Sequence, residues 1–159
     1  MRRGVRLGVD WGQARIGVAA CDPDGLLAYP VRTIPAGPDA VAELAKTVAE
    51  YQPIEVILGL PLTLGGTEEF AAASVREAAS GLDQALGVPV RLVDERLTTA
   101  QAAQALRQAG RSARRQRRVI DQAAAVALLE QAMNYERTTG CPPGRVADDP
   151  ERDAKGRNR

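Results

Sequence analysis

The chain has 159 residues, of which 45% are hydrophobic and only 3% aromatic, and its formal net charge is +1. This length fits a single domain, and a charge so close to zero does not by itself predict binding to a polyanion. The sequence contains no histidine, which excludes Ser-His-Asp catalysis, Cys-His catalysis and zinc sites built on histidine.

Other missing patterns narrow the function further. No GxxxxGK[ST] segment is present, so the phosphate-binding loop of P-loop NTPases is excluded. There is also no apolar run long enough to span a bilayer and no signal-peptide pattern, so we expect a soluble cytoplasmic protein that does not contact a membrane. An enzyme of this composition would have to work with carboxylates, arginines, hydroxyl groups or a bound metal.

The first part of the chain predicts a three-stranded antiparallel meander. Residues 6–10 form an apolar run that ends in Asp10, and residues 15–21 alternate so that their apolar side chains share one face. Residues 26–34 follow as a third strand after a turn that contains proline and glycine. Because Pro30 has no backbone N–H to donate, we expect the third strand at an edge of the sheet.

The rest of the chain alternates between helical and strand patterns. Helices are expected between Asp39 and Pro53, from Thr67 to Leu86, from about Thr98 to Gln108, and from between Arg114 and Val119 to about Tyr135, with strands at residues 54–58 and 90–94. Strands joined through helices predict parallel pairing with right-handed crossovers. The chain therefore predicts an α/β fold of order βββαβαβαα around one mixed sheet.

No linker divides this pattern, so residues 1–138 are expected to form one domain. Residues 139–159 are rich in Pro, Gly, Asp and Arg and have little to bury. We expect them to form a disordered tail.

Three acidic residues stand at the ends of apolar segments: Asp10, Glu95 and Asp121. Each has an ordinary explanation as a turn cap, an ion-pair partner or a residue of the first helical turn. A buried carboxylate is costly, however, unless it is paired or bound to a metal. Strand alternation points Asp94 and Glu95 to opposite faces, so only one of them can join Asp10. Since the three elements converge on one sheet edge, the trio is the candidate catalytic set.

A divalent cation would give these three acids a common purpose. Hard cations bind carboxylate oxygens. Two such ions about 3.5–4 Å apart can activate water and stabilise the leaving oxygen of a phosphodiester without any histidine.

The stretch between Glu95 and Asp121 contains no acid. It contains seven arginines, which are Arg96, Arg107, Arg111, Arg114, Arg115, Arg117 and Arg118. Such a segment can bind phosphates bidentately and supply salt-dependent affinity for nucleic acid. The alternative is a solvated connection between two helices. Its position between two candidate acids favours phosphate binding.

Several motifs follow one another along the chain. They are Val9-Asp10-Trp11-Gly12 with Arg15-Ile16-Gly17-Val18-Ala19, Leu58-Gly59-Leu60-Pro61-Leu62 with Gly66-Thr67-Glu68, Val93-Asp94-Glu95-Arg96-Leu97-Thr98-Thr99, and Ile120-Asp121-Gln122-Ala123-Ala124. In this order, over about residues 5–136, they resemble the YqgF/RuvX family, which is ribonuclease H-like. Its bacterial members are called Holliday junction resolvases or pre-16S rRNA nucleases. The resemblance implies a ribonuclease H-like five-stranded mixed sheet with flanking helices and a central Asp10 strand. It also implies that Asp10, Glu95 and Asp121 bind Mg²⁺ or Mn²⁺.

These observations favour a metal-dependent nuclease. Asp10, Glu95 and Asp121 would be the metal ligands, Arg15 and Arg96 would contact a phosphate or the transition state, and the segment from Arg111 to Arg118 would hold the substrate. Precursor ribosomal RNA is the favoured substrate and branched DNA the next. A junction resolvase has to cut symmetrically, so it would act as a two-fold homodimer.

Two other hypotheses stay open. The first is a nucleic-acid-binding factor without catalysis, in which the acids are structural. The second is an ATPase of the related actin or sugar-kinase fold, which would need a second domain of this kind and a much longer chain.

Overall fold

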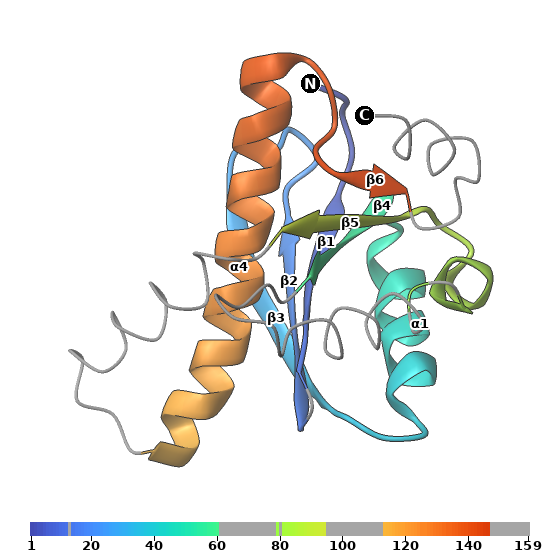
Figure 1. Cartoon of the computed structure of the whole chain (residues 1–159), viewed down its shortest axis with the longest axis vertical. Coiled ribbons are helices and arrows are strands. Elements are labelled where there is room, and N and C mark those ends of the chain that lie inside the picture. Colours follow the sequence, from blue (N-terminus) through green and yellow to red (C-terminus); the bar gives the residue numbers. More distant parts are fainter. Residues whose placement is uncertain (13, 61–78, 80, 95–112, 147–159) are drawn as a thin grey trace, which may run out of the picture.

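The computed structural model describes residues 1–12, 14–60, 79, 81–94 and 113–146, with the backbone alone described at residues 60, 94, 113–121 and 145. A single sheet lies at the centre, with one long helix against one face and a shorter helix against the other (Figure 1). The elements are β1 (Arg6–Trp11), β2 (Arg15–Cys21), β3 (Ala28–Pro35), α1 (Ala40–Tyr51), β4 (Glu55–Leu60), β5 (Val90–Asp94), α4 (Ala113–Thr139) and β6 (Arg145–Val146). Residues 81–86 are also helical.

The described strands form one mixed sheet in the order β3-β2-β1-β4-β5-β6. β1, β4 and β5 run parallel to one another, whereas the β1–β2, β2–β3 and β5–β6 pairs are antiparallel. The predicted mixed α/β sheet with an inner Asp10 strand is therefore confirmed. Pro30 lies in the outer strand β3, as predicted from its missing N–H group.

The turn between β2 and β3 is organised by Asp22. Its carboxylate accepts hydrogen bonds from the backbone N–H groups of Leu27 (2.7 Å) and Leu26 (2.8 Å). These bonds, that of Leu27 foremost, lower the pKa of Asp22. Because the two leucines belong to the turn, β3 begins at Ala28, two residues later than the predicted start of the strand.

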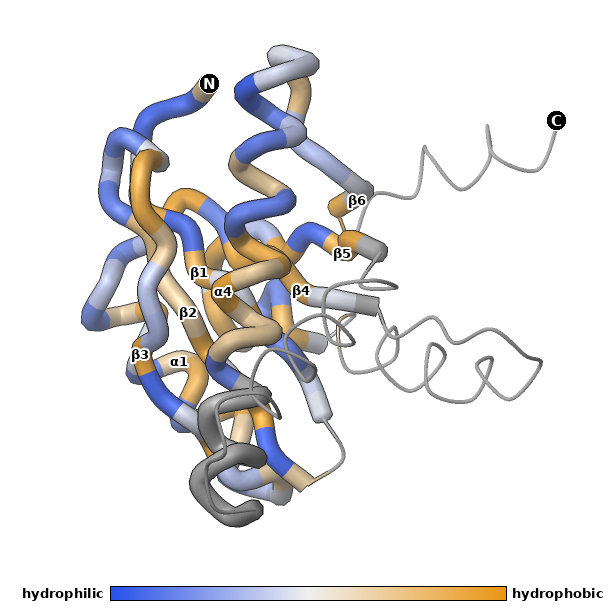
Figure 2. The backbone as a smooth tube through the Cα atoms, turned by 90° about the vertical axis from the view of Figure 1, so that its left-hand side faces the viewer, coloured by the Kyte–Doolittle hydropathy of each residue, from blue (hydrophilic) through white to orange (hydrophobic). Residues whose placement is uncertain are grey.

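Two apolar layers hold the helices to the sheet. The α1-facing layer includes Leu7, Val9, Ile16, Val18, Leu44, Val56, Leu58, Leu82, Val90 and Leu92. The α4-facing layer includes Ala19, Cys21, Ile57, Val93, Ala125, Leu128, Leu129 and Met133. Strand alternation separates the two sets, and Figure 2 shows α4 crossing in front of β1 and β2. Among the described helices, none combines the length and the apolar character that a membrane span requires.

α4 approaches the sheet most closely at Gly8 in β1. A Cβ atom at this position would lie 2.7 Å from the carbonyl oxygen of Ala125 and 3.0 Å from Cβ of Leu129. These distances are shorter than van der Waals contact, so only glycine lets the helix backbone lie at this height above the strand.

Residues 139–146 are part of the described fold, although the sequence predicts that they belong to a disordered tail. α4 continues to Thr139, Gly140 follows it with a φ of +75°, and β6 pairs with β5. The guanidinium of Arg91 also donates a hydrogen bond to the carbonyl oxygen of Pro143. The five predicted strands are β1 to β5, and the two-residue strand β6 is added at the edge of the predicted mixed sheet. The segment 139–159 that is predicted as a disordered tail thus includes residues 139–146, which the structure shows as ordered. The reason is that this polar segment is ordered by β5 and Arg91, which composition cannot reveal.

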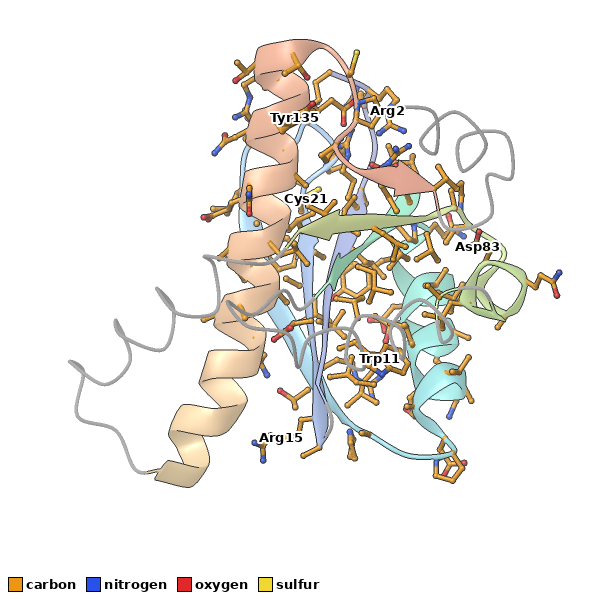
Figure 3. All side chains as sticks on the ribbon, viewed as in Figure 1. Arg2, Trp11, Arg15, Cys21, Asp83 and Tyr135 are labelled. Carbon is orange, nitrogen blue, oxygen red and sulfur yellow. The ribbon has the colours of Figure 1, made fainter. Side chains whose placement is uncertain are left out.

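A buried ion network lies at the amino ends of the parallel strands. It consists of the buried residues Arg6, Glu55, Arg91 and Glu136, with Glu55 and Glu136 only 1% and 2% exposed, and of Arg2, whose side chain is 43% exposed. Glu136 accepts from Arg2 at 2.9 Å and from Arg6 at 3.1 Å, while Glu55 accepts from Arg2 at 2.8 Å and from Arg91 at 3.0 Å. The network joins the N-terminal segment, β1, β4, β5 and α4, at the end of the molecule where Figure 3 labels Arg2.

Candidate active site

Asp10 lies next to the last residue of β1, on the face of the sheet that α4 covers. Leu7 and Val9 belong to the α1-facing layer, whereas Gly8 faces Ala125 of α4. Because side chains alternate along a strand, Asp10 shares the side of Gly8. Its side chain is half-buried, so the carboxylate is presented where the strand end meets the helix.

The carboxyl ends of β1, β4 and β5 meet at the edge of the sheet that carries Asp10. Val9, Leu58 and Leu92 form one row across the three strands. Asp10 follows this row by one residue, and Asp94, the last residue of β5, follows it by two. The carboxyl edge of parallel strands is where open α/β sheets bind their ligands. The predicted ligand Glu95 comes directly after Asp94 and lies outside the described residues.

The alignment of α4 with β1 brings position 121 toward Asp10. The two elements run antiparallel, because the buried ion network joins the end of α4 to the start of β1 and Ala125 lies against Gly8. From Gly8 to Asp10 the strand advances about 6.6 Å, and from Ala125 back to residue 121 the helix advances about 6 Å. The backbone of Asp121 therefore lies beside the part of β1 that carries Asp10. The structure does not describe the side chain of Asp121.

A hydrogen bond between α4 and β3 gives the same alignment. Nε2 of Gln122 donates to Oγ1 of Thr33 at 3.0 Å. Thr33 pairs with Gly17 in β2, and Gly17 pairs with Asp10 in β1. Asp10, Gly17 and Thr33 thus form one row across the sheet, and the residue after Asp121 is bonded to the end of that row.

A pocket of about 300 Å³ opens at this corner of the molecule. Its described lining residues are Arg15, Thr33, Pro35 and Gln122. Arg15 pairs with Pro35 two residues beyond the Gly17–Thr33 pair, and Figure 3 shows it near the lower end of the strands, on the side toward α4. Arg15 is one of the predicted phosphate contacts, whereas Thr33 and Gln122 are not predicted as site residues, since no local pattern connects two residues 89 positions apart.

The predicted nucleic-acid-binding arginines fall into three groups. Arg15 lines the pocket. Arg114, Arg115, Arg117 and Arg118 lie on the first two turns of α4, where the backbone alone is described. Arg96 and Arg111 lie outside the described residues. Four of the seven predicted arginines therefore lie on the same helix as Asp121, within two turns of it.

Two solved structures share this fold. Thermus thermophilus RuvC in complex with a Holliday junction substrate matches with a TM-score of 0.58 and 17% identity, over 87% of this chain and 99% of that chain. A second structure of Thermus thermophilus RuvC matches with a TM-score of 0.55 and 16% identity, over 89% and 99%. At these identities the likeness concerns the fold alone, and it confirms the predicted ribonuclease H-like architecture.

Relatives in sequence are much closer. A Cutibacterium acnes protein is 58% identical over 135 residues, which cover 84% of each chain. A Streptomyces coelicolor protein is 56% identical over 147 residues, which cover 91% of this chain and 88% of that one. Both are provisionally named as pre-16S rRNA nucleases. The RuvX family model, described as Holliday junction resolvase, matches residues 4–135, and the chain therefore belongs to the RuvX family.

Proposed function

We propose that this protein is a divalent-metal-dependent nuclease that acts in the cytoplasm on the precursor of 16S ribosomal RNA. The observation that carries the proposal is the alignment of α4 with β1, which brings the backbone of Asp121 beside Asp10. Membership of the RuvX family supports the hydrolysis of nucleic acid. The names of the relatives from Cutibacterium acnes and Streptomyces coelicolor support the RNA substrate.

Asp10, Glu95 and Asp121 would hold the metal. Their carboxylate oxygens are hard donors that suit Mg²⁺ or Mn²⁺. Asp10 fits this role, because its neighbours on the α4-facing side of β1 and β2 are Gly8 and Gly17, which bring no side chain against the carboxylate. A metal bound there would activate water and stabilise the leaving oxygen of the phosphodiester.

Strand alternation favours Glu95 over Asp94 as the third ligand. Val93 belongs to the α4-facing layer and Leu92 to the α1-facing layer. Glu95 comes two residues after Val93 and so has the same parity in the strand pattern of the sequence, which is the reason to propose Glu95 and not Asp94 as the ligand.

The arginines would hold the substrate while the acids hold the metal. Guanidinium groups form bidentate hydrogen bonds with phosphate oxygens. Arg15 in the pocket and the arginines at the start of α4 flank Asp10 and Asp121 along the chain. We therefore assign substrate binding to Arg15, Arg96, Arg111, Arg114, Arg115, Arg117 and Arg118.

The Asp10→Asn variant tests this proposal. The substitution keeps the size of the side chain but removes a negative oxygen ligand, so metal-dependent cleavage of an RNA containing the 5′ end of pre-16S rRNA should fall at least about 100-fold. Cleavage is measured with Mg²⁺, with Mn²⁺ and with EDTA.

Asp39→Asn is the matched control for this experiment. Asp39 is exposed and precedes α1 without making a side-chain capping bond, so this variant should cleave like the wild type. Undiminished cleavage by purified D10N protein would contradict the proposed mechanism.

Branched DNA is the second candidate substrate. It is favoured by the description of the family and by the fold shared with RuvC bound to a Holliday junction. A resolvase has to make paired cuts and would act as a two-fold homodimer. Symmetric cuts in a four-way DNA junction, without cleavage of the RNA, would favour this alternative. Binding that EDTA does not change, with no cleavage of either substrate, would instead favour a non-catalytic factor.

A further inference from the structure

We propose that the pocket between β2, β3 and α4 binds the sugar–phosphate backbone of the substrate and that Gln122 and Thr33 recognise a ribose 2′-hydroxyl group there. The proposal rests on the proposed nuclease function and adds the contact that would distinguish RNA from DNA. The pocket volume of about 300 Å³ lies at the lower end of the range for small-molecule sites, which suits a single nucleotide.

Gln122 and Thr33 form a fixed polar pair inside this pocket. They are joined by the 3.0 Å hydrogen bond between Nε2 and Oγ1. In this arrangement the carbonyl oxygen of Gln122 can still accept a hydrogen bond and the hydroxyl of Thr33 can still donate one. If the amide is turned over, the amide nitrogen of Gln122 can donate a hydrogen bond to a ligand, and the hydroxyl oxygen of Thr33 can accept one from it. In both orientations the pair offers one donor and one acceptor to a ligand.

A ribose 2′-hydroxyl group matches this pair. It both donates and accepts a hydrogen bond, and it is the group by which proteins distinguish RNA from DNA at a given site. A nucleobase edge fits the pocket less well, because none of the described lining residues carries an aromatic ring on which a base could stack.

Arg15 also favours the sugar–phosphate backbone as the ligand. It lies in the same pocket as Thr33 and Gln122, and its guanidinium is suited to a phosphate group. In RNA every internal 2′-hydroxyl adjoins a phosphate. One pocket can therefore contact both groups of the same nucleotide, without regard to base sequence.

The pocket adjoins the proposed cleavage site. Thr33 shares one row of the sheet with Asp10 through Gly17. Two strand spacings separate the α-carbons of Thr33 and Asp10, a distance of about 10 Å. A nucleotide bound in the pocket would therefore lie close to the phosphate that is cleaved.

Binding to RNA and DNA of the same sequence tests this proposal. The experiment uses the full chain carrying Asp10→Asn, in EDTA, with short fluorescent single strands and anisotropy as the readout. We expect RNA to bind more tightly than DNA. Adding Gln122→Ala or Thr33→Val should weaken RNA binding about five- to tenfold, as for one lost hydrogen bond, and change DNA binding less than about twofold.

Two further variants control for the fold. Gln131→Ala removes an exposed glutamine from the same helix and should change neither affinity. Thr33→Ser keeps the hydroxyl group and should bind RNA like the parent protein. The urea midpoint of each variant reports whether its fold is intact.

Single 2′-deoxy substitutions along the RNA locate the contact without any change to the pocket. At one position of the RNA, the 2′-deoxy substitution should weaken binding to the parent protein by about the same factor as Gln122→Ala does. The same 2′-deoxy substitution should not weaken binding to the Gln122→Ala protein any further. The proposal is overturned if Gln122→Ala and Thr33→Val weaken RNA binding and DNA binding equally or weaken neither. It is also overturned if no single 2′-hydroxyl group contributes to RNA binding. Those results would leave the nuclease function standing, because metal-dependent cleavage by the wild type tests it separately.

Discussion

Gly8 lies two residues before Asp10, at the closest approach between β1 and α4. Its missing side chain lets the carbonyl oxygen of Ala125 reach the strand. Any larger residue would raise the helix and, with it, the backbone of Asp121. The spacing between two proposed metal ligands therefore depends on a residue that is itself without functional groups.

The Gly8→Ala variant tests this dependence. The added methyl group would overlap the backbone of α4, so we expect the free energy of unfolding to fall by about 1–3 kcal/mol, as in other overpacked cores. Cleavage should fall as well, because the helix has to move away from Asp10. Urea denaturation and the metal-dependent cleavage assay measure the two effects.

Gly81→Ala is the matched control. Gly81 lies in the helical segment 81–86, where an added methyl group meets no atom within 4 Å. Its stability should be unchanged or higher by up to about 1 kcal/mol, because alanine favours a helix. Wild-type stability and activity in G8A would show that the packing of α4 does not control the site.

α4 is the element on which the proposed activity depends most, and its 27 residues have three different tasks. Its last turns are bonded to β1 through Glu136, and its middle packs on the sheet through Ala125 and Leu129. Its first two turns carry the four arginines and extend past the ends of the strands in Figure 1. The positive end of the helix dipole adds to the charge of these arginines.

Replacing Arg114, Arg115, Arg117 and Arg118 together by alanine should weaken nucleic-acid binding and reduce its salt dependence. For a single strand, each lost phosphate contact lowers the slope of log K against log salt by about 0.7, so the slope should fall by up to about 3. Anisotropy titrations over a range of salt concentrations measure it.

Arg3→Ala provides the control for this charge change. Arg3 is 79% exposed and pairs with Asp24 in the β2–β3 turn, which lies away from the proposed active site. The slope should therefore stay at the wild-type value. An unchanged slope in the fourfold variant would argue against a substrate-binding role for the start of α4.

Across the whole molecule, the two ends of the sheet differ in their charged groups: one carries the proposed metal ligands and the other an ion-paired network. Asp10 lies half-buried at the carboxyl edge, whereas the buried ion network closes the amino edge. The network joins segments from residue 2 to residue 136, so it fixes α4 to the sheet at the end opposite the proposed active site. Removing one partner from such a network is strongly destabilising, because it leaves a buried charge unpaired.

The network predicts that acid destabilises the fold. Burial raises the pKa of Glu136, but hydrogen bonds from Arg2 and the charges of Arg2 and Arg6 outweigh it and lower the pKa from 4.5 to about 2. Because the pKa is lower in the folded state, Glu136 stabilises the protein above about pH 4.5, and this contribution is lost as the pH falls toward 2. It amounts to about 3 kcal/mol, which urea denaturation between pH 7 and pH 2 would measure.

Glu136→Gln isolates the contribution of this residue. At pH 7 the variant should be about 3–5 kcal/mol less stable than the wild type, and its stability should fall less steeply in acid. Glu50→Gln alters an exposed glutamate and should keep the wild-type pH dependence. This account would be contradicted if the free energies of unfolding of E136Q and the wild type fell in parallel as the pH is lowered.

Local patterns in the sequence were enough to predict most elements. The helix expected between Asp39 and Pro53 is α1, and the strand that contains Pro30 is an outer one. Cys21 is buried at the end of β2, and burial raises the pKa of its thiol. Asp39 precedes α1 as predicted but makes no side-chain capping bond. These features depend on backbone geometry and side-chain periodicity over a few residues, and such short patterns can be read directly from the sequence.

The sequence by itself determined the order of the described elements from β1 to α4 and the mixed sheet, and it indicated Asp10, Glu95 and Asp121 as candidate acids at the ends of apolar segments. Only the tertiary structure decided that residues 145–146 form β6, that Arg2 meets Glu136 and that Thr33 meets Gln122. Turn chemistry and hydrophobic periodicity act between near neighbours in the chain. Contacts between residues far apart in the chain depend instead on how closely the elements pack, as α4 packs on β1 at Gly8.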